Sequence, residues 1–368
     1  MKILLPLNKL TKYFDARKDS ELADEILNEL YFGLAPEDTK QIRRFYELQN
    51  FSLSKSYRKY ILSMIGEESK EMFSYVYENK FGLDEIQILN RSRYEENPYY
   101  KLLSKIKNYK KGNIEFRQNK VPSFVPVAIN EKIHDKDAYF KDKTPIGIFT
   151  EDFYFPAIIQ DEVTWMSFAP HETETSEDAV ERAHGNVVTF GCGLGYFPYM
   201  VSEKENVSSV TIVEFDQKII DFFKENLLPL FPHKEKIKIV HGDAVKFAKN
   251  AAEPYDFLFA DIWHDVFDGL PFYLIFKKNE HVAKECTYWI EKDMLTFFRR
   301  LVVSLIEEES LGYTDKDYVS QETFVDRLLS VLHFHLKEKV IKNAAELNDF
   351  LTDESLIELI KELPEVKI

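Results

Sequence analysis

Residues 187–195 read VVTFGCGLG, and residues 210–214 read VTIVE. The two apolar runs predict buried strands, and the glycines predict a tight turn that leads from the first strand into a helix. An acid, Glu214, ends the second strand. A βαβ unit of this kind binds the adenosine half of a cofactor, because glycines let the backbone approach the ligand and the acid accepts hydrogen bonds from the ribose hydroxyls.

The pattern continues on both sides of this unit as an alternation of strands and helices. Strands are predicted at 187–190, 210–214, 237–240, 256–260 and 286–290. Helices are predicted at about 195–203, 216–227, 243–250, 270–283 and 293–309. This alternation predicts an α/β fold, in which a mostly parallel, twisted, Rossmann-like sheet is covered by helices on both faces.

The chain divides into four predicted regions. We expect a mainly helical N-terminal domain at 1–135, a β-hairpin or bridging segment at 136–175, the cofactor domain at 176–310 and a helical C-terminal extension at 311–368. Helical spacing at 21–30 and the start signal Pro36-Glu37-Asp38 support the first of these.

The bridging segment carries its own local signals. Residues 146–149 and 153–155 flank a polar turn and predict a hairpin, and residues 163–168 predict another strand. Thr175 or Ser176 is expected to cap a short helix that stops at Gly185.

Composition limits the class of protein. The 368 residues are 45% hydrophobic and carry a formal net charge of -15, which argues against broad, charge-driven binding of nucleic acid. The stretch 101–120 is locally basic and is interpreted as a solvated helix face and loop, with a surface for an anionic partner as the alternative. No apolar run is long enough for a signal peptide or a membrane span, so a cytoplasmic protein without membrane contact is expected.

Four features converge on one ligand. They are the glycine turn, Glu214, the strand that ends at Asp243-Ala244 and the strand that ends at Asp261. All four lie at the carboxyl ends of predicted parallel strands, where ligands bind in such sheets. Tyr196 stands where a dinucleotide fingerprint has Gly or Ala, which disfavours NAD and FAD, and no phosphate-binding Gly-Lys-Ser/Thr is present.

Over about residues 185–300 the chain resembles the class I, Rossmann-like methyltransferase superfamily, which implies S-adenosylmethionine as cofactor. Matched by position, the resemblance implies that the glycine turn lines the methionine and ribose, Glu214 holds the ribose with Phe215 against the adenine, and Asp243 and Ala244 read the adenine edge. The cofactor-binding residues expected are Gly191, Cys192, Gly193, Gly195, Tyr196, Glu214, Phe215, Asp243, Ala244 and Asp261. Thr189 departs from the superfamily, many members of which carry an acid there.

Spermidine-synthase-like proteins share this core, and the chain has a distant resemblance to them. Their turn usually carries an acid where this chain has Leu194. Their two acids after the fourth strand are spaced D-x-x-D, whereas Asp261 and Asp265 are spaced D-x-x-x-D. Aminopropyl transfer is therefore the second enzymatic hypothesis.

The loop after the fourth strand holds the candidate chemistry. Asp261, His264 and Asp265 are the candidate catalytic residues, because an imidazole or a carboxylate there can remove a proton from a nucleophile or orient an amine. Trp263 is interpreted as packing, Asp268-Gly269 as a turn and Cys192 as a small packing residue. Residues 171–174 resemble a metal cluster only superficially, and no metal is expected.

The preferred hypothesis is an S-adenosylmethionine-dependent methyltransferase that acts on a small molecule or a protein. The sequence motifs of amino-directed and cytosine-C5 nucleic-acid methyltransferases do not follow the fourth strand, which argues against a nucleic-acid substrate. Two alternatives stay open, an aminopropyltransferase and a non-catalytic S-adenosylmethionine-binding partner or sensor. The acceptor and the oligomeric state are left open.

Overall fold

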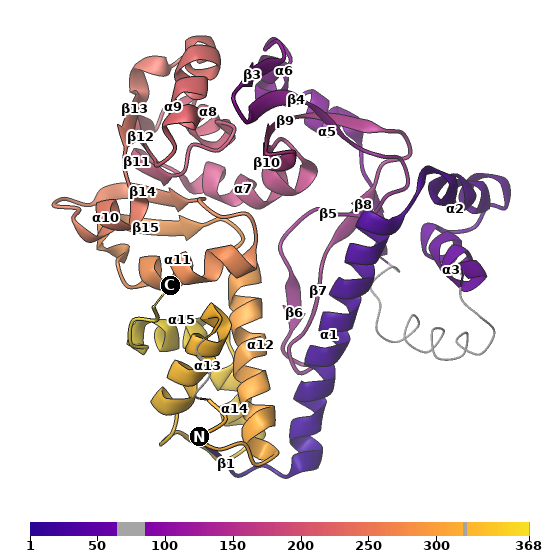
Figure 1. The fold of residues 1–368 in the computed structure, drawn as a ribbon, viewed down its shortest axis with the longest axis vertical. Helices are drawn as coiled ribbons and strands as arrows, with labels where there is room; N and C mark the ends of the chain where they lie inside the picture. Colours follow the sequence, from indigo (N-terminus) through magenta and orange to yellow (C-terminus); the bar gives the residue numbers. More distant parts are fainter. Residues whose placement is uncertain (65–84, 319–321, 368) are drawn as a thin grey trace.

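The computed structural model describes residues 1–64, 85–318 and 322–367. Its centre is a five-stranded parallel sheet in the order β13-β12-β11-β14-β15. The strands are β11 (Gly185–Phe190), β12 (Val207–Glu214), β13 (Ile237–His241), β14 (Tyr255–Ala260) and β15 (Ala283–Tyr288). The predicted α/β fold with a parallel sheet is therefore confirmed (Figure 1).

The central strands are mainly apolar and are buried over their last four residues, because both faces of the sheet are covered. Val187, Val188 and Phe190 of β11 are fully buried, as are Phe257 and Ala260 of β14. Continuous apolar runs of this kind are typical of parallel sheets between two helical layers.

The strand order places the helices on the two faces. From β11 the chain moves outward to β12 and β13, and then returns past β11 to β14 and β15. Because crossovers are right-handed, this reversal of direction puts the later helices on the opposite face from the earlier ones. The helices are α7 (Pro170–Arg182), α8 (Tyr196–Ser202), α9 (Gln217–Phe222), α10 (Ala244–Lys249), α11 (Val266–Lys277) and α12 (Glu291–Ser310).

The N-terminal region combines helices with a second sheet. Its helices are α1 (Leu7–Gly33), α2 (Pro36–Leu48), α3 (Leu53–Met64), α5 (Arg91–Glu95) and α6 (Pro98–Leu103). The antiparallel sheet β10-β9-β4-β3 consists of β3 (Tyr109–Lys111), β4 (Ile114–Val121), β9 (Phe153–Gln160) and β10 (Val163–Ser167). Figure 1 shows β9 and β10 beside α7, at the edge of the Rossmann-like domain.

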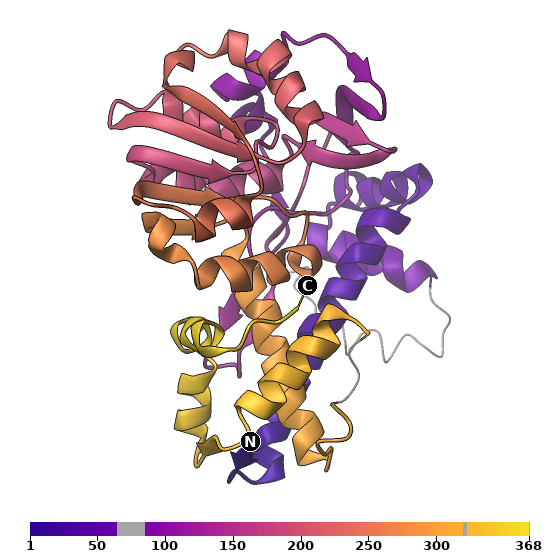
Figure 2. The same ribbon diagram turned by 60° about the vertical axis from the view of Figure 1, so that its left-hand side comes forward.

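Short strands and the long helix α1 complete this region. A three-stranded sheet joins β2 (Gln87–Ile88), β8 (Ile146–Ile148) and β5 (Val127–Ala128), and a hairpin joins β6 (Ile133–Asp135) to β7 (Lys141–Lys143). Helix α1 lies beside α12 in both views (Figures 1 and 2). Arg300 of α12 joins the two, because its guanidinium pairs with Asp24 of α1 at 2.8 Å and with Asp142 of β7 at 2.5 Å.

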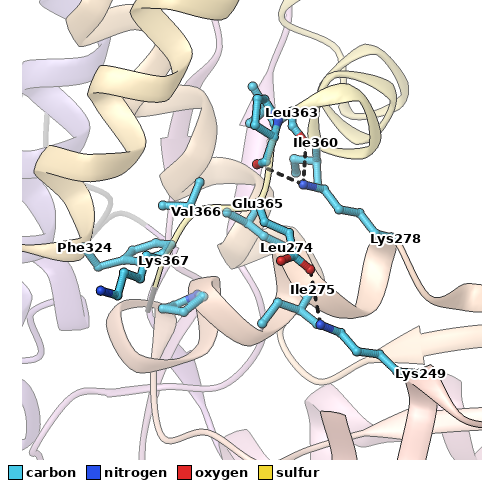
Figure 3. Close-up of a pocket in the computed structure, with 12 residues that line it drawn as sticks. Lys249, Leu274, Ile275, Lys278, Phe324, Ile360, Leu363, Glu365, Val366 and Lys367 are labelled. Carbon is cyan, nitrogen blue, oxygen red and sulfur yellow. Dashed lines mark hydrogen bonds and ion pairs between the residues drawn. The ribbon is translucent and has the colours of Figure 1, made fainter. Parts of the chain in front are cut away.

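The C-terminal region packs on α11 and α12. It contains α13 (Phe324–His335), α14 (Ala344–Phe350) and α15 (Asp353–Glu362), and its strand β16 (Val340–Ile341) pairs in parallel with β1 (Lys2–Ile3) at the start of the chain. Figure 3 shows the final segment lying across α11, where Lys278 Nζ donates to the Leu363 carbonyl at 2.5 Å and Lys249 pairs with Glu365 at 3.2 Å. The segment therefore fastens the end of the chain to the helix that follows the fourth strand.

Several local predictions are confirmed. Strand β10 matches the predicted strand at 163–168, and α2 starts at Pro36 with the Asp38 carboxylate accepting the Ala35 N–H at 2.8 Å.

Other local predictions are wrong. In the stretch 101–120 the helix and loop end before Tyr109, and the remainder is strand, since β3 and β4 pair with each other and β4 also pairs with β9. Residues 146–148 and 153–155 do not form a hairpin, because β8 pairs with β2 and β5 whereas β9 pairs with β4 and β10. Helix α7 starts at Pro170, before the predicted caps, because proline at the first helical position favours that start.

No helix among the described residues has the length and apolar character needed to cross a bilayer.

Candidate functional site

A cavity of about 720 Å³ opens at the carboxyl ends of the central strands. It lies where β11 and β14 are neighbours although their following helices cover opposite faces, which is the usual ligand position in open α/β sheets. Its volume is in the range of small-molecule sites. Strand β10 and helix α7 supply a second wall from outside the parallel sheet.

The glycine turn brings the ends of β11 and β14 together. Gly191 has a φ of +89°, and a Cβ at this position would lie 2.0 Å from the carbonyl oxygen of Asp261. Gly193 also has positive φ but faces open space within the cavity lining. Gly195 lies outside the lining, where its missing side chain leaves room for the hydroxyl of Tyr99.

Glu214 ends β12 with both carboxylate oxygens held by the backbone. It accepts the Cys192 N–H at 2.9 Å and the Asp216 N–H at 2.8 Å. Burial raises the pKa of Glu214, although these backbone donors favour the charged form. The carboxylate is thereby fixed at the rim of the glycine turn, in a position suited to ribose hydroxyls.

The predicted adenine-binding residues line the same cavity. Asp243 caps α10 with one oxygen, which accepts the Val245 N–H at 2.8 Å, and the buried Ala244 follows it. Phe215, next to Glu214 in the chain, is 74% exposed and belongs to the lining. Tyr196, at the start of α8, also contributes to the lining.

Asp261 and Glu172 are the two acids in the cavity with the largest shifts in pKa. Burial raises the pKa of Asp261 to about 7, with the charge of Glu214 adding to the effect. Burial likewise raises the pKa of Glu172 to about 8, with the charge of Asp261 adding to it. Perturbed carboxyl groups in a cleft are typical of functional sites.

The three candidate catalytic residues are placed differently. Asp261 and His264 line the cavity, whereas Asp265 lies outside the lining and caps α11. The Asp265 carboxylate accepts the Phe267 N–H at 2.7 Å, and the Asp268 carboxylate accepts the Asp265 N–H at 3.0 Å, which is the reciprocal pair of a capping box. Residues 268–269 therefore belong to the first turn of a helix, and the predicted turn there is wrong.

His264 is held at the mouth of the cavity. Its Nδ1 lies 2.8 Å from the Asp268 carboxylate, and its ring lies edge-on to Trp165 of β10, with the ring centres 4.0 Å apart. Trp263 is buried and donates its indole N–H to the Trp289 carbonyl at 3.2 Å, which is a packing arrangement, although the residue also contributes to the cavity lining.

Sequence reasoning missed the second wall of the site. Gln160, Trp165, Met166 and Ser167 reach the cavity from β9 and β10, and Glu172 and Ser176 reach it from α7. Glu172 and Ser176 are four residues apart and so share one face of the helix. That spacing was the available local signal, but only the docking of α7 on the sheet turns this face toward the cavity.

The sequence His171-Glu172-Thr173-Glu174 does not converge on a single point. His171 packs edge-on to Trp289 and has a pKa lowered to about 4 by burial, whereas Glu174 accepts the hydroxyl of Tyr94 at 3.0 Å. Across the described ranges, no group of three or more metal-ligating side chains is arranged to hold an ion.

Both cysteines are free thiols, and burial raises the pKa of Cys192, which suits packing and not nucleophilic attack.

Residues 181–279 match the family model of the spermine/spermidine synthase domain. No curated protein matches the chain in sequence.

Among solved structures, a spermidine synthase from Thermotoga maritima is 13% identical, with a TM-score of 0.30 over 39% of this chain and 54% of that one. A spermidine synthase in complex with the transition-state analogue AdoDATO gives the same values. A structure described as a putative O-methyltransferase from Klebsiella pneumoniae is 17% identical, with a TM-score of 0.23 over 28% of this chain and 48% of that one. The chain thus spans about half the length of these structures.

The sheet order, the glycine turn and the match to the family model all indicate the same kind of domain. Residues 181–279 carry a domain that resembles the spermine/spermidine synthase domain, built on a class I, Rossmann-like α/β fold.

Proposed function

We propose that the protein is an aminopropyltransferase-like enzyme that uses an S-adenosyl sulfonium donor without a carboxylate, namely decarboxylated S-adenosylmethionine. The observation that carries this proposal is the acidic lining of the cavity. Five carboxylate side chains line it, and the described lining includes no Lys or Arg: Glu172, Glu214, Asp216, Asp243 and Asp261.

The charge distinguishes the two donors. S-adenosylmethionine carries a carboxylate on the chain attached to sulfur, and this lining has no Lys or Arg side chain to pair with it. Decarboxylated S-adenosylmethionine carries only the sulfonium and an ammonium, both of which are attracted by carboxylates. At an effective dielectric of about 20, one pair of like charges about 6 Å apart costs about 3 kcal/mol, which is roughly a hundredfold in affinity.

The matched domain supports the same reaction class. The match to the spermine/spermidine synthase domain covers the glycine turn and the strand ends at Glu214, Asp243 and Asp261. The residues of this chain would bind the adenosine through Glu214 and Asp243, and would hold the sulfonium near Asp261. Positioning the nucleophile against the electrophilic carbon supplies much of the rate in such displacements.

Methyl transfer from S-adenosylmethionine is the second candidate. It is favoured by the placement of Asp265, which caps α11 outside the cavity and so leaves the loop after β14 with one acid in the site. Leu194 likewise stands where spermidine-synthase-like proteins usually carry an acid.

Product identification separates these candidates. The protein is incubated with each donor and a panel of primary amines, thiols and small acids, and the nucleoside product is identified by mass spectrometry. Methylthioadenosine from the decarboxylated donor supports the proposal, whereas S-adenosylhomocysteine from S-adenosylmethionine supports methyl transfer. Binding of methylthioadenosine with neither product formed would point to a non-catalytic binding protein and overturn the proposal.

A further inference from the structure

Tyr99 of α6 reaches the glycine turn from outside the Rossmann-like domain. Its side chain is fully buried, and its hydroxyl donates a hydrogen bond to the carbonyl of Leu194. Leu194 belongs to the cavity lining, whereas Tyr99 does not and precedes the segment 181–279 that matches the family model. Tyr99 therefore contacts the backbone of the site without lining the cavity itself.

The Leu194 carbonyl depends on Tyr99 for a hydrogen-bond donor. Helix α8 begins after Gly195, whose carbonyl accepts the Tyr199 N–H at 3.1 Å. In a helical pattern the donor to the Leu194 carbonyl would be residue 198, which is a proline and has no N–H. Among the residues that the structure describes, the Tyr99 hydroxyl is the one donor to this carbonyl. Removing it would leave a buried acceptor unpaired, which is unfavourable.

Gly195 is matched to the same hydroxyl group. Its φ is +88°, and an added Cβ would lie 2.5 Å from the Tyr99 hydroxyl oxygen. The oxygen that holds the Leu194 carbonyl thus also occupies the space beside the last glycine of the turn. A side chain at 195 and the hydroxyl of Tyr99 therefore exclude each other.

The position of the Tyr99 hydroxyl is fixed by its own surroundings. Asn97 caps α6 by accepting the Tyr99 N–H at 2.8 Å, and Pro98 occupies the first helical position. The Tyr99 ring packs against the rings of Tyr199 and Phe231, with ring centres 4.8 Å and 6.2 Å apart. Burial raises the pKa of Tyr99 well above its usual range, so the hydroxyl keeps its proton and remains a donor.

Glu214 holds the same turn at another point. Its carboxylate accepts the Cys192 N–H at 2.9 Å, and the Gly195 N–H donates to the Cys192 carbonyl at 3.0 Å, which closes the turn on itself. The turn is thus fastened at Cys192 through the predicted ribose-binding acid and at Leu194 through Tyr99. Displacement of the Leu194 carbonyl would shift the residues of the cavity lining that lie between these two points.

We propose that Tyr99 is a positioning residue for the S-adenosyl donor, because its hydroxyl holds the Leu194 carbonyl and so fixes the glycine turn in the conformation that receives the donor. The inference rests on the proposed function. It adds that the affinity for the donor depends on a side chain of the N-terminal region, outside the segment that carries the glycine turn and the acids of the strand ends.

The test uses the full chain and isothermal titration calorimetry with methylthioadenosine. Tyr99→Phe removes the hydroxyl and keeps the ring. Tyr94→Phe is the matched control, because Tyr94 is also a buried tyrosine of the N-terminal region, and its hydroxyl donates to Glu174 of α7 at 3.0 Å. Neither Tyr94 nor Glu174 lines the cavity. Urea unfolding of each variant measures the loss of stability that accompanies the missing hydrogen bond.

Tyr99→Phe should bind methylthioadenosine about tenfold more weakly than wild type, whereas Tyr94→Phe should bind it with wild-type affinity. Both variants should lose stability, so the difference in affinity separates positioning of the turn from a general weakening of the N-terminal region. In turnover with the decarboxylated donor, Tyr99→Phe should raise the KM for the donor and keep kcat close to the wild-type value, because the hydroxyl lies outside the cavity.

Gly195→Ala tests the same contact from the side of the turn. By itself it should also weaken methylthioadenosine binding, because the added methyl group collides with the Tyr99 hydroxyl. In Tyr99→Phe that oxygen is absent, so Gly195→Ala should reduce the affinity by a smaller factor than in wild type. The contact with Phe223 Cε2 at 3.0 Å and the positive φ are common to both backgrounds and cancel in the double-mutant cycle.

Three results would overturn the inference and leave the proposed function standing. They are wild-type methylthioadenosine affinity in folded Tyr99→Phe or Gly195→Ala, an equal loss of affinity in Tyr94→Phe, and strictly additive effects of the changes at 99 and 195. Absence of methylthioadenosine binding by folded wild type would instead overturn the proposed function itself.

Discussion

The variant Gly191→Ala tests whether the close approach of two strand ends builds the site. Gly191 has a φ of +89°, and an added Cβ would meet the Asp261 carbonyl oxygen at 2.0 Å. Because the obstacle is backbone, relief requires the ends of β11 and β14 to separate. A left-handed conformation costs an L-residue about 1–2 kcal/mol, and overpacking adds about 1–3 kcal/mol, so the expected loss of stability is roughly 2–5 kcal/mol.

Gly193→Ala is the matched control in the same turn. Its φ is +52°, and its nearest neighbour to an added Cβ is the Gly195 nitrogen at 4.0 Å. This variant should therefore lose only the backbone contribution, about 1–2 kcal/mol. The difference between the two variants isolates the collision with Asp261.

Urea unfolding without ligand, at one pH, measures both variants. We expect Gly191→Ala to unfold at the lower midpoint with an unchanged slope, at a cost about 1–3 kcal/mol greater than that of Gly193→Ala. Calorimetry with methylthioadenosine should then show weaker binding in Gly191→Ala, because the Asp261 end of β14 is displaced. Equal stability of the two variants would refute the idea that the strand ends require a glycine at 191.

Three further predictions concern acids in the cavity and beside it. In folded protein without ligand, burial raises the Glu172 pKa from 4.5 to about 8, so the unfolded state loses its proton first as pH rises and the free energy of unfolding falls across that range. In thermal melts, Glu172→Gln should show a smaller fall of Tm between pH 4.5 and pH 8 than wild type, and a higher Tm at pH 8. An unchanged dependence of Tm on pH in this variant would contradict the prediction. Glu214→Gln removes a charged acceptor beside the glycine turn and should weaken methylthioadenosine binding by about 1.5–3 kcal/mol in calorimetry, with unaltered affinity as the contrary result. Asp265→Asn keeps the helix cap and should leave product formation intact, whereas Asp265→Ala should lose about 1 kcal/mol in urea unfolding; a large loss of turnover in Asp265→Asn would place that acid in the reaction.

The central sheet could be predicted because its information is local. Each strand is a short apolar run that ends in a polar residue, and glycines and helix caps separate the runs. Right-handed crossovers then limit how such units assemble, so the strand ends at Gly191, Glu214, Asp243 and Asp261 were expected on one edge. The structure places all four in one cavity lining.

The pairing of the N-terminal strands could not be predicted in the same way. Residues 146–148 and 153–155 look like the arms of a hairpin, yet β8 pairs with β2 and β5, and β9 pairs with β4 and β10. Antiparallel partners are chosen by packing between distant segments, and a local alternation of apolar and polar residues is compatible with several partners.

The two acids after the fourth strand also show the difference between what the sequence predicts and what the structure decides, here within a single loop. Both were candidate catalytic residues in the sequence, with the stronger claim for Asp261 because it lies at the strand end itself. In the structure the peptide N–H groups at the start of α11 take the Asp265 carboxylate as a cap, and Asp261 is left facing the cavity. Helix caps compete for short acidic side chains, and the start of α11 lies at 266, earlier than the predicted 270.

The sequence by itself determined the α/β class, the parallel strands and the acids at their carboxyl ends, because periodicity, glycine turns and strand ends are properties of neighbouring residues. Only the tertiary structure decided which other groups share the cavity with them. Glu172 is distant in sequence from Asp261, and the docking of α7 and β10 against the sheet brings Glu172 and Trp165 to the same cavity. That docking depends on long-range packing, and the burial that results from it raises the pKa of both acids. A local sequence pattern contains neither the packing nor the burial.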